Sequence, residues 1–394
     1  MVSLGLWRFR ARRLWGGERC IRVGIAALLV PVVAACTTTT TSGSDGAAPL
    51  ASGATGTYTP VRVPEVREAR AWPFAADSIW NVAIGSGARY VPAGIEASEK
   101  TGVFVEEEIL VLEPDAPLVT VMESRADWDL DADRCVSEGG VLDRVPIPPG
   151  FTTDAMIPGT PNSAAAVLRP DGRTLHQSQP FMVCGSGTTT SHYAFDDADL
   201  YGPGIVGSHG GSGLSALGGT IRLGELVPGA VIRHALKIVI DSRFMSYTSN
   251  DATPGYRWPA SKADGSASPL TYLGQEPGLR MGSLLALPPD FPVDALTTEP
   301  ARIIARAARD YGIYVVDSSG WDAYYLATEW SPRGRVIDEF ATSWGMPFVQ
   351  TDRRHPWSVD MATIVTAVEV VDNNTPGSVG GGGTPRAPAP PPFG

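Results

Sequence analysis

Apolar and polar residues alternate with a period of two over residues 231–240, which is the clearest strand signal in the sequence. The even positions form one apolar face that contains a single histidine; they are Ile232, His234, Leu236, Ile238 and Ile240. Because successive side chains of a strand point to opposite faces, we expect this set to face a core.

Similar apolar runs predict further strands over 103–112, 118–122 and 313–316, the first of them interrupted by three glutamates. Residues 165–168 and 174–177 flank a Pro-Asp-Gly turn and predict a hairpin.

One stretch instead has the spacing of an amphipathic helix, with apolar residues on one face of 301–311. Thr298 can cap this helix and Gly312 can end it. A second helix is predicted over 336–344. Since strands predominate, we predict a mainly β fold, a β-sandwich or jelly-roll-like single domain with one or two helices.

The N-terminal 35 residues have the pattern of an export signal. Six arginines precede an apolar run over 23–35, which leads into Cys36 through small residues. The run is shorter than the roughly 20 residues that span a bilayer. It resembles a bacterial lipoprotein signal, which implies lipidation of Cys36 and an extracytoplasmic protein that is lipid-anchored to the cell membrane. An uncleaved N-terminal anchor is the alternative.

Composition divides the rest of the chain into three parts. Residues 36–57 are rich in Thr, Ser and Gly and predict a disordered spacer. Residues 373–394 are rich in Gly and Pro and predict a disordered tail. The segment 58–372 contains no obvious linker, so we expect it to form one β-rich globular domain.

The net charge of the chain limits the partners that it can bind. The chain has 31 basic and 42 acidic residues, and the predicted signal removes six of the basic ones. Such an acidic mature chain argues against nucleic-acid binding and against contact with an anionic membrane face other than through the anchor. We expect a monomer.

Cysteine use indicates a disulfide. Cys20 and Cys36 belong to the predicted signal and its lipidation site, which leaves Cys135 and Cys184 for the exported domain. Two cysteines in an exported domain most simply pair with each other. They cannot close a zinc site unaided, so no metal or other cofactor is predicted.

Potential acid, base and nucleophile residues are densest over 191–234, among glycines that would let a ligand approach the backbone. The candidate catalytic residues are His192, Tyr193, His209, Glu225 and His234. They would line a polar cleft at one rim of the sandwich, whereas the alternative is a glycine-rich loop with solvated side chains. An inward-facing His234 is either a structural histidine, bonded through both ring nitrogens, or a general base.

A second segment, 258–265, combines an aromatic ring with a cation and a carboxylate, as sugar-binding sites do. The candidate substrate-binding residues are Trp258, Lys262, Asp264 and Arg233. Trp258 could equally pack in the core.

Six motifs occur in one order along the chain: 74–81 (FAADSIWN), 167–172 (VLRPDG), 232–236 (IRHAL), 256–260 (YRWPA), 280–282 (RMG) and 304–312 (IARAARDYG). Together they resemble a family of secreted bacterial β-rich proteins for which no activity is established. The resemblance implies a single exported β-rich domain. Members carry an acidic residue near the second hairpin strand, where this chain has Gln177, so no catalytic role is transferred to that position.

These observations predict a cell-surface lipoprotein that acts on a polysaccharide or cell-wall glycan, as a polysaccharide lyase or a glycosidase. The alternative is a non-catalytic glycan-binding or cell-envelope structural lipoprotein.

Overall fold

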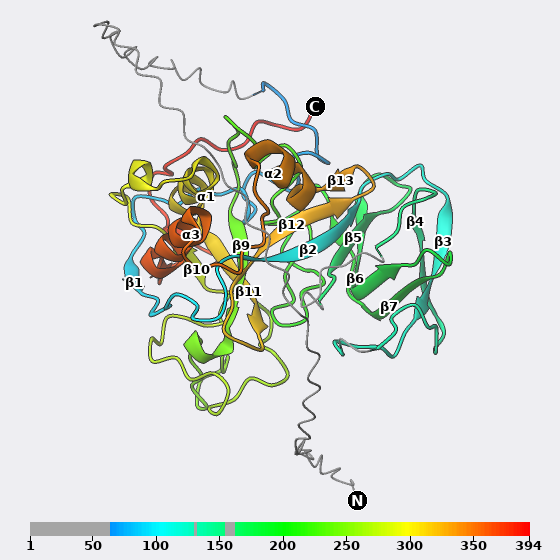
Figure 1. Ribbon diagram of the computed structural model, residues 1–394, viewed down its shortest axis with the longest axis horizontal. Coiled ribbons are helices and arrows are strands. Elements are labelled where there is room, and N and C mark those ends of the chain that lie inside the picture. The colour runs from blue at the N-terminus through cyan, green and yellow to red at the C-terminus, as the bar shows by residue number, and fades with distance from the viewer. Residues whose placement is uncertain (1–63, 130–131, 154–161) are drawn as a thin grey trace, which may run out of the picture. The chain divides into compact units, whose positions relative to one another are not determined.

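The computed structural model describes residues 64–129, 132–153 and 162–394 (Figure 1). The predicted signal, the predicted lipidation site at Cys36 and the predicted spacer over 36–57 lie outside the described residues.

The strands of the described chain form one mixed sheet of 14 strands. Along the sheet, the first seven strands in spatial order are β1 (Tyr90–Pro92), β14 (Glu369–Val371), β10 (Leu284–Ala286), β11 (Ile313–Ser319), β9 (Leu236–Asp241), β12 (Tyr325–Ser331) and β2 (Phe104–Val111). The next five are β5 (Ala165–Leu168), β6 (Thr174–Val183), β7 (Thr189–Ala194), β3 (Leu118–Glu123) and β4 (Val141–Pro146). Two short strands pair beside this path, β13 (Gly334–Arg335) with β12 and β8 (Ala198–Asp199) with β6.

This sheet contains both parallel and antiparallel pairs. The pairs β11–β9, β12–β2, β2–β5 and β3–β7 are parallel, and the remaining ladders are antiparallel. The mainly β class predicted from the sequence is confirmed, and the arrangement is consistent with a β-sandwich-like domain. The predicted hairpin is β5 and β6, with Ala165 opposite Ser178 and Leu168 opposite Leu175.

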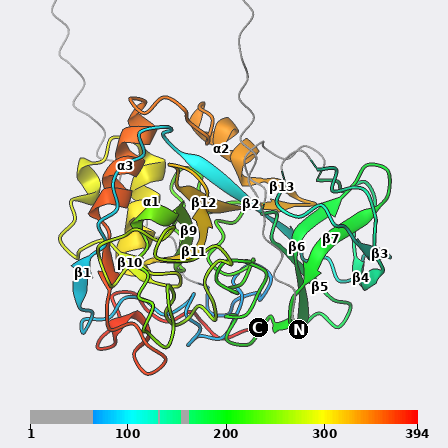
Figure 2. The same cartoon turned by 90° about the horizontal axis from the view of Figure 1, so that it is seen from below.

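The described residues contain three α-helices rather than the one or two predicted: α1 (Glu299–Asp310), α2 (Val336–Trp344) and α3 (Pro356–Ala367). Three short 3-10 helices accompany them: η1 (Ser242–Phe244), η2 (Val293–Ala295) and η3 (Val379–Gly381). Helices α1 and α3 lie side by side near β10, as Figures 1 and 2 both show.

Helix α1 begins and ends where the sequence predicts, but its start is held differently. The Thr298 side chain makes no capping bond within its own helix. Instead, Thr298 Oγ1 donates to Asp360 Oδ2 of α3 at 2.7 Å, and the same oxygen accepts the Thr298 backbone N–H at 2.6 Å. A carboxylate from the neighbouring helix therefore anchors the residue at which α1 begins, whereas the capping bond expected within α1 is not made.

Strand β9 shows how the sheet is buried. Its ladder begins at Leu236, so residues 231–235 of the predicted strand are not part of it. Leu236, Ile238 and Ile240 pack in the core on the helical face, whereas Val239 packs in a second core on the opposite face. The two cores therefore cover both faces of β9, and its neighbours β11 and β12 pair with both of its edges.

The prediction that residues 373–394 form a disordered tail is wrong. Residues of this segment bond to the domain: Gly85 N–H donates to Gly380 O at 2.9 Å, and Arg386 N–H donates to Ile84 O at 2.9 Å. Arg67 Nε donates to Pro391 O at 2.8 Å, and the Arg67 guanidinium lies 3.9 Å from the Phe393 ring centroid. The segment is ordered by these partners, which its composition could not reveal, so the domain continues beyond residue 372.

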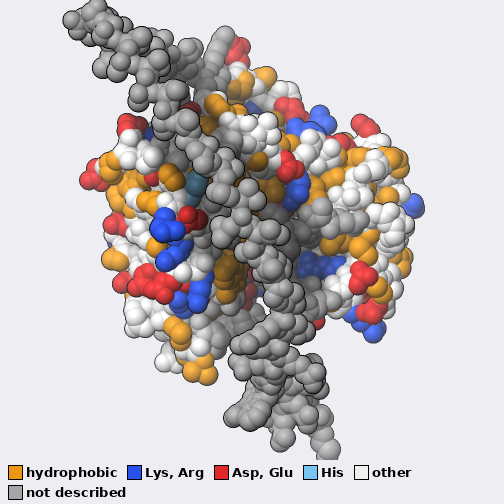
Figure 3. All heavy atoms as spheres, in the orientation of Figure 1, with side chains coloured by type: hydrophobic (Ala, Val, Ile, Leu, Met, Phe, Trp, Pro, Cys, Tyr) orange, Lys and Arg blue, Asp and Glu red, His pale blue; other side chains and the backbone are white. Residues whose placement is uncertain are grey.

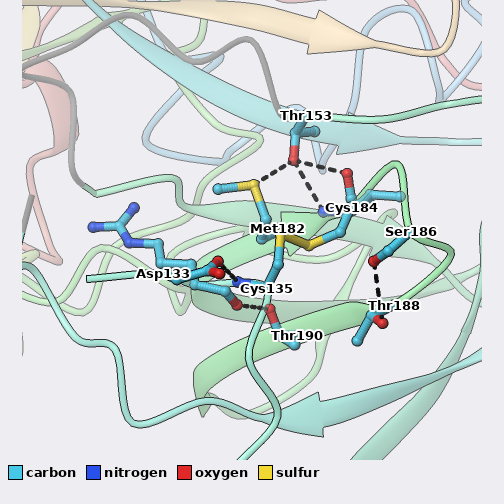
Figure 4. The surroundings of a disulfide bond; sticks show 10 residues. Asp133, Cys135, Thr153, Met182, Cys184, Ser186, Thr188 and Thr190 are labelled. Atoms are coloured by element: carbon cyan, nitrogen blue, oxygen red, sulfur yellow. Dashed lines mark hydrogen bonds between the residues drawn. A yellow bond between two sulfur atoms is a disulfide. The ribbon is translucent and has the colours of Figure 1, made fainter. Parts of the chain in front are cut away.

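The predicted disulfide between Cys135 and Cys184 is confirmed (Figure 4). It ties the loop after β3 to the end of β6, beside a bond from Thr190 Oγ1 to the Arg134 carbonyl. None of the described helices is long and apolar enough to cross a membrane.

Candidate functional site

A cavity of about 480 Å³ opens near the carboxyl ends of β7 and β11. Aromatic side chains form one rim, and Gly210 and Gly211 lie in its wall. The loop over 262–266 also lines the cavity. The aromatic lining residues are Trp128, Tyr193 and Phe195. Such a rim offers ring faces on which the apolar face of a sugar can stack.

Two carboxyl groups, Asp264 and Asp317, meet in this cavity. A Cβ atom placed on Gly211 would lie 2.5 Å from Asp317 Oδ1 and 2.8 Å from Asp264 Oδ1. Asp264 comes from the cavity loop, and Asp317 from β11, where it is only 6% exposed. Glycine at position 211 leaves room for both side chains to reach one point.

Hydrogen bonds fix Asp264. Its Oδ2 accepts Ser318 Oγ–H at 2.6 Å and Tyr272 O–H at 2.7 Å. Burial, together with the charge of Asp317, raises the pKa of Asp264 to about 7 despite the lowering effect of those two donors. Two carboxyl groups this close cannot both ionise easily, so the pair holds one proton near neutral pH.

His209 lies directly behind the pair and is fully buried. Its Nε2 is 2.9 Å from Glu108 Oε1, and its Nδ1 is 3.8 Å from Asp317 Oδ2. Burial acts to lower the pKa of His209, but the Glu108 and Asp317 carboxyl groups outweigh it, so the pKa is raised.

A buried cation, Lys237, lies next to Glu108. Lys237 Nζ lies 3.1 Å from Glu108 Oε1 and donates to the carbonyls of Ser215 and Ala216 at 3.1 and 2.7 Å. Burial lowers the pKa of Lys237, and Glu108 opposes that effect. The carbonyls and the carboxylate together replace the water that the ammonium has lost.

Glu106 completes the buried cluster. Burial and repulsion from Glu108 raise its pKa to about 8, although His209 favours the charged form. Asn162, which lines the cavity, donates to Glu106 Oε2 at 3.1 Å.

Carboxyl groups outnumber cations in this cluster. Glu106, Glu108, Asp264 and Asp317 lie near His209 and Lys237, and the Arg134 guanidinium also acts on Glu106. The carboxyl groups of Glu106 and Asp264, with pKa values of about 8 and 7, retain protons at slightly acidic pH, which lowers the negative charge that is buried here.

Sequence reasoning missed Glu106, Glu108, Lys237 and Asp317. The signal for the first two was the run of three glutamates, which was interpreted as an interruption of the strand. In β2 the glutamates alternate, so Glu106 and Glu108 share a face, whereas Glu107 points the other way and accepts Arg335 Nε at 2.8 Å. Lys237, a cation in a central strand, was a second signal.

Some predicted site residues are brought together here. Tyr193, Lys262 and Asp264 line the cavity, with His209 immediately behind it. His192 does not line the cavity but packs against its rim: its ring centroid lies 4.1 Å from that of Tyr193 and 5.8 Å from that of Trp128. Its Nδ1 lies 2.8 Å from the Ser124 carbonyl oxygen.

The others lie elsewhere. Glu225, Arg233 and His234 line a different cavity, of about 390 Å³, which shares no lining residue with the first. His234 Nε2 is 3.0 Å from Glu225 Oε2, and its Nδ1 is 2.9 Å from the Ala235 carbonyl oxygen. Both ring nitrogens thus face acceptors, which matches the structural histidine among the two interpretations. Trp258 packs against the core cluster that contains Trp80 and Tyr314.

Within the described residues, no group of three or more His, Cys, Asp or Glu side chains has a geometry that could hold a metal ion. Comparison of the chain with protein-family models, with curated proteins and with solved structures finds no match.

Proposed function

We propose that this protein is a glycosidase whose catalytic pair is Asp264 and Asp317. The observation that carries the proposal is the meeting of two carboxyl groups, one with a pKa of about 7, inside an aromatic-rimmed cavity. Glycosidases use one carboxylic acid and one carboxylate at the scissile bond, and an environment that separates their proton affinities assigns the two roles.

In the proposed reaction Asp264 gives its proton to the glycosidic oxygen as the C–O bond breaks. Asp317 attacks the anomeric carbon and forms a glycosyl ester. Water then hydrolyses the ester while the Asp264 carboxylate takes the proton from that water, which restores both groups. Inverting enzymes need about 6.5–9.5 Å between the carboxyl groups to admit a water, and retaining enzymes need about 5–5.5 Å, so the close approach of this pair is nearer to the retaining arrangement.

The charge of the cavity favours a glycosidase over a lyase. A lyase must neutralise the uronate carboxylate of its substrate, whereas this cavity presents Asp264 and Asp317. Lys262 is the one cationic side chain among the described lining residues, and its ammonium lies over the Phe195 ring at 5.3 Å from the centroid. A neutral or cationic sugar fits these surroundings better than a uronate.

We also propose that the enzyme works outside the cytoplasm, at the cell surface. The disulfide supports this placement, because such bonds persist in oxidising compartments. Acidic and basic side chains are interspersed over the face in Figure 3, which offers no broad basic area for a polyanion.

The test uses the full chain on a panel of neutral, amino-sugar and uronate polysaccharides. Released reducing ends report hydrolysis, and ultraviolet absorbance reports the unsaturated product of a lyase. We expect hydrolysis with retained anomeric configuration. Asp264→Asn and Asp317→Asn should each lower kcat by about a hundredfold or more. Glu225→Gln, in the other cavity, is the matched control and should retain turnover.

Three results would overturn the proposal. Unsaturated products would identify a lyase. Saccharide binding through Trp128 and Tyr193 without turnover would identify a non-catalytic glycan-binding protein. Turnover that survives both Asn substitutions would remove the pair from the chemistry.

A further inference from the structure

His209 occupies a position that the proposed reaction does not by itself explain. The residue is 0% exposed and immediately precedes Gly210 and Gly211 of the cavity wall. Its backbone is fixed by N–H donation to Leu214 O at 3.0 Å and by its carbonyl, which accepts Gly213 N–H at 2.7 Å. This tight turn places the His209 ring between Glu108 of β2 and Asp317 of β11.

Charged groups on three strands lie around the ring. Strand β2 contributes Glu106 and Glu108, β11 contributes Asp317, and β9 contributes Lys237, whose positive charge opposes protonation of the ring. Carboxyl oxygens lie near both ring nitrogens, Glu108 Oε1 at 2.9 Å from Nε2 and Asp317 Oδ2 at 3.8 Å from Nδ1. A neutral imidazole would turn a lone pair toward one of them, which buried surroundings penalise.

We propose that His209 is a positioning residue that stays doubly protonated between Glu108 and Asp317 and so keeps the proton of the catalytic pair on Asp264. The inference rests on the proposed function for the roles of the two aspartates, but the charge state of His209 does not.

The position of the proton matters because the two carboxyl groups are neighbours with different tasks. A cation behind Asp317 favours the ionised form of Asp317. The hydroxyl groups of Ser318 and Tyr272 donate to Asp264 and favour its ionised form too, so the cation is needed to keep the proton on Asp264. Lys237 neutralises Glu108 from the far side, so that carboxylate does not have to be balanced by His209 alone.

The first experiment is independent of turnover. In full-length protein labelled with ¹⁵N histidine, the His209 ring nitrogens should both be protonated at pH 7, and His209→Gln should remove that pair of signals. A His209 ring with one protonated nitrogen at pH 7 would overturn the inference. The result does not bear on the glycosidase proposal, which the turnover assays test separately.

The second experiment reads the pH dependence of turnover. His209→Gln should lower kcat with a smaller change in KM and move the acidic limb of the pH profile to higher pH. Glu108→Gln removes a carboxylate that favours protonation of His209, so it should also move the acidic limb of the pH profile to higher pH. His234→Gln is the matched control, since it removes another histidine–carboxylate pair, a partly buried one at the other cavity, and should leave the profile in place. An unchanged profile in His209→Gln would contradict the positioning role.

Discussion

Lys237 Nζ lies 3.1 Å from Oε1 of Glu108, and both side chains are fully buried. A charged pair withdrawn from water is costly to break, because removal of one partner leaves the other charge uncompensated.

Lys237→Met should therefore lower the free energy of unfolding by about 3–5 kcal/mol. Urea denaturation at pH 7 measures the change. Lys262→Met, at an exposed position in the cavity loop, should stay within about 0.5 kcal/mol. A loss below about 1 kcal/mol in Lys237→Met would show that the buried pair contributes little.

Gly211→Ala tests the geometry of the carboxyl pair. Its Cβ would meet Asp317 Oδ1 at 2.5 Å and Asp264 Oδ1 at 2.8 Å, so the carboxyl groups must separate. A displacement on the order of 1 Å can reduce turnover about a hundredfold, which the reducing-end assay would detect. Gly265→Ala is the control in the same cavity, because its Cβ would meet nothing within 4 Å. Equal losses in both variants would exclude the pair as the cause.

The His234–Glu225 pair should make stability fall as the pH rises. Burial acts to lower the pKa of His234, but Glu225 and the Ala235 carbonyl outweigh it, so the folded-state pKa is raised. The stabilisation is then complete below the unfolded-state pKa of about 6.5. It is lost as the pH rises through the higher folded-state pKa. Urea denaturation between pH 6 and pH 9 should show this decline, and His234→Gln should reduce it. An identical decline in both proteins would assign it to other groups.

Removal of the disulfide should destabilise the fold. The bond joins cysteines 49 residues apart. Loop closure of about this length contributes roughly 4 kcal/mol on the chain-entropy model. The double substitution Cys135→Ser and Cys184→Ser should lower the free energy of unfolding by about that amount. Wild-type protein with its disulfide reduced is the matched comparison and should behave like the double variant. A reduced protein as stable as the oxidised one would contradict the prediction.

The sequence alone determined the local elements with strong periodicity. The hairpin of β5 and β6, helix α2 and the start and end of α1 follow from apolar spacing and turn residues, which act over a few positions. Helix α3 was missed because its apolar residues do not keep to one face. The ordered segment over 373–394 was missed because its order comes from distant partners such as Ile84 and Arg67.

Only some residues of the candidate site can be identified from the sequence. Tyr193 and His209 are predicted as catalytic residues together with Glu225 and His234, which line the other cavity, whereas Lys262 and Asp264 are predicted to bind substrate. The proposed catalytic partner of Asp264 is Asp317, 53 positions further along the chain in β11.

The sequence by itself determined the strand-rich class, the cysteine pair and the supply of acid and base groups, because these depend on composition and short-range pattern. Tertiary structure decided which groups meet and which carry protons. Glu106 and Glu108 are solvated side chains in an isolated strand, and only the strands packed beside β2 remove them from water and set His209 and Lys237 against them. Burial and charge proximity are properties of the folded chain, and they make this cluster a candidate for catalysis.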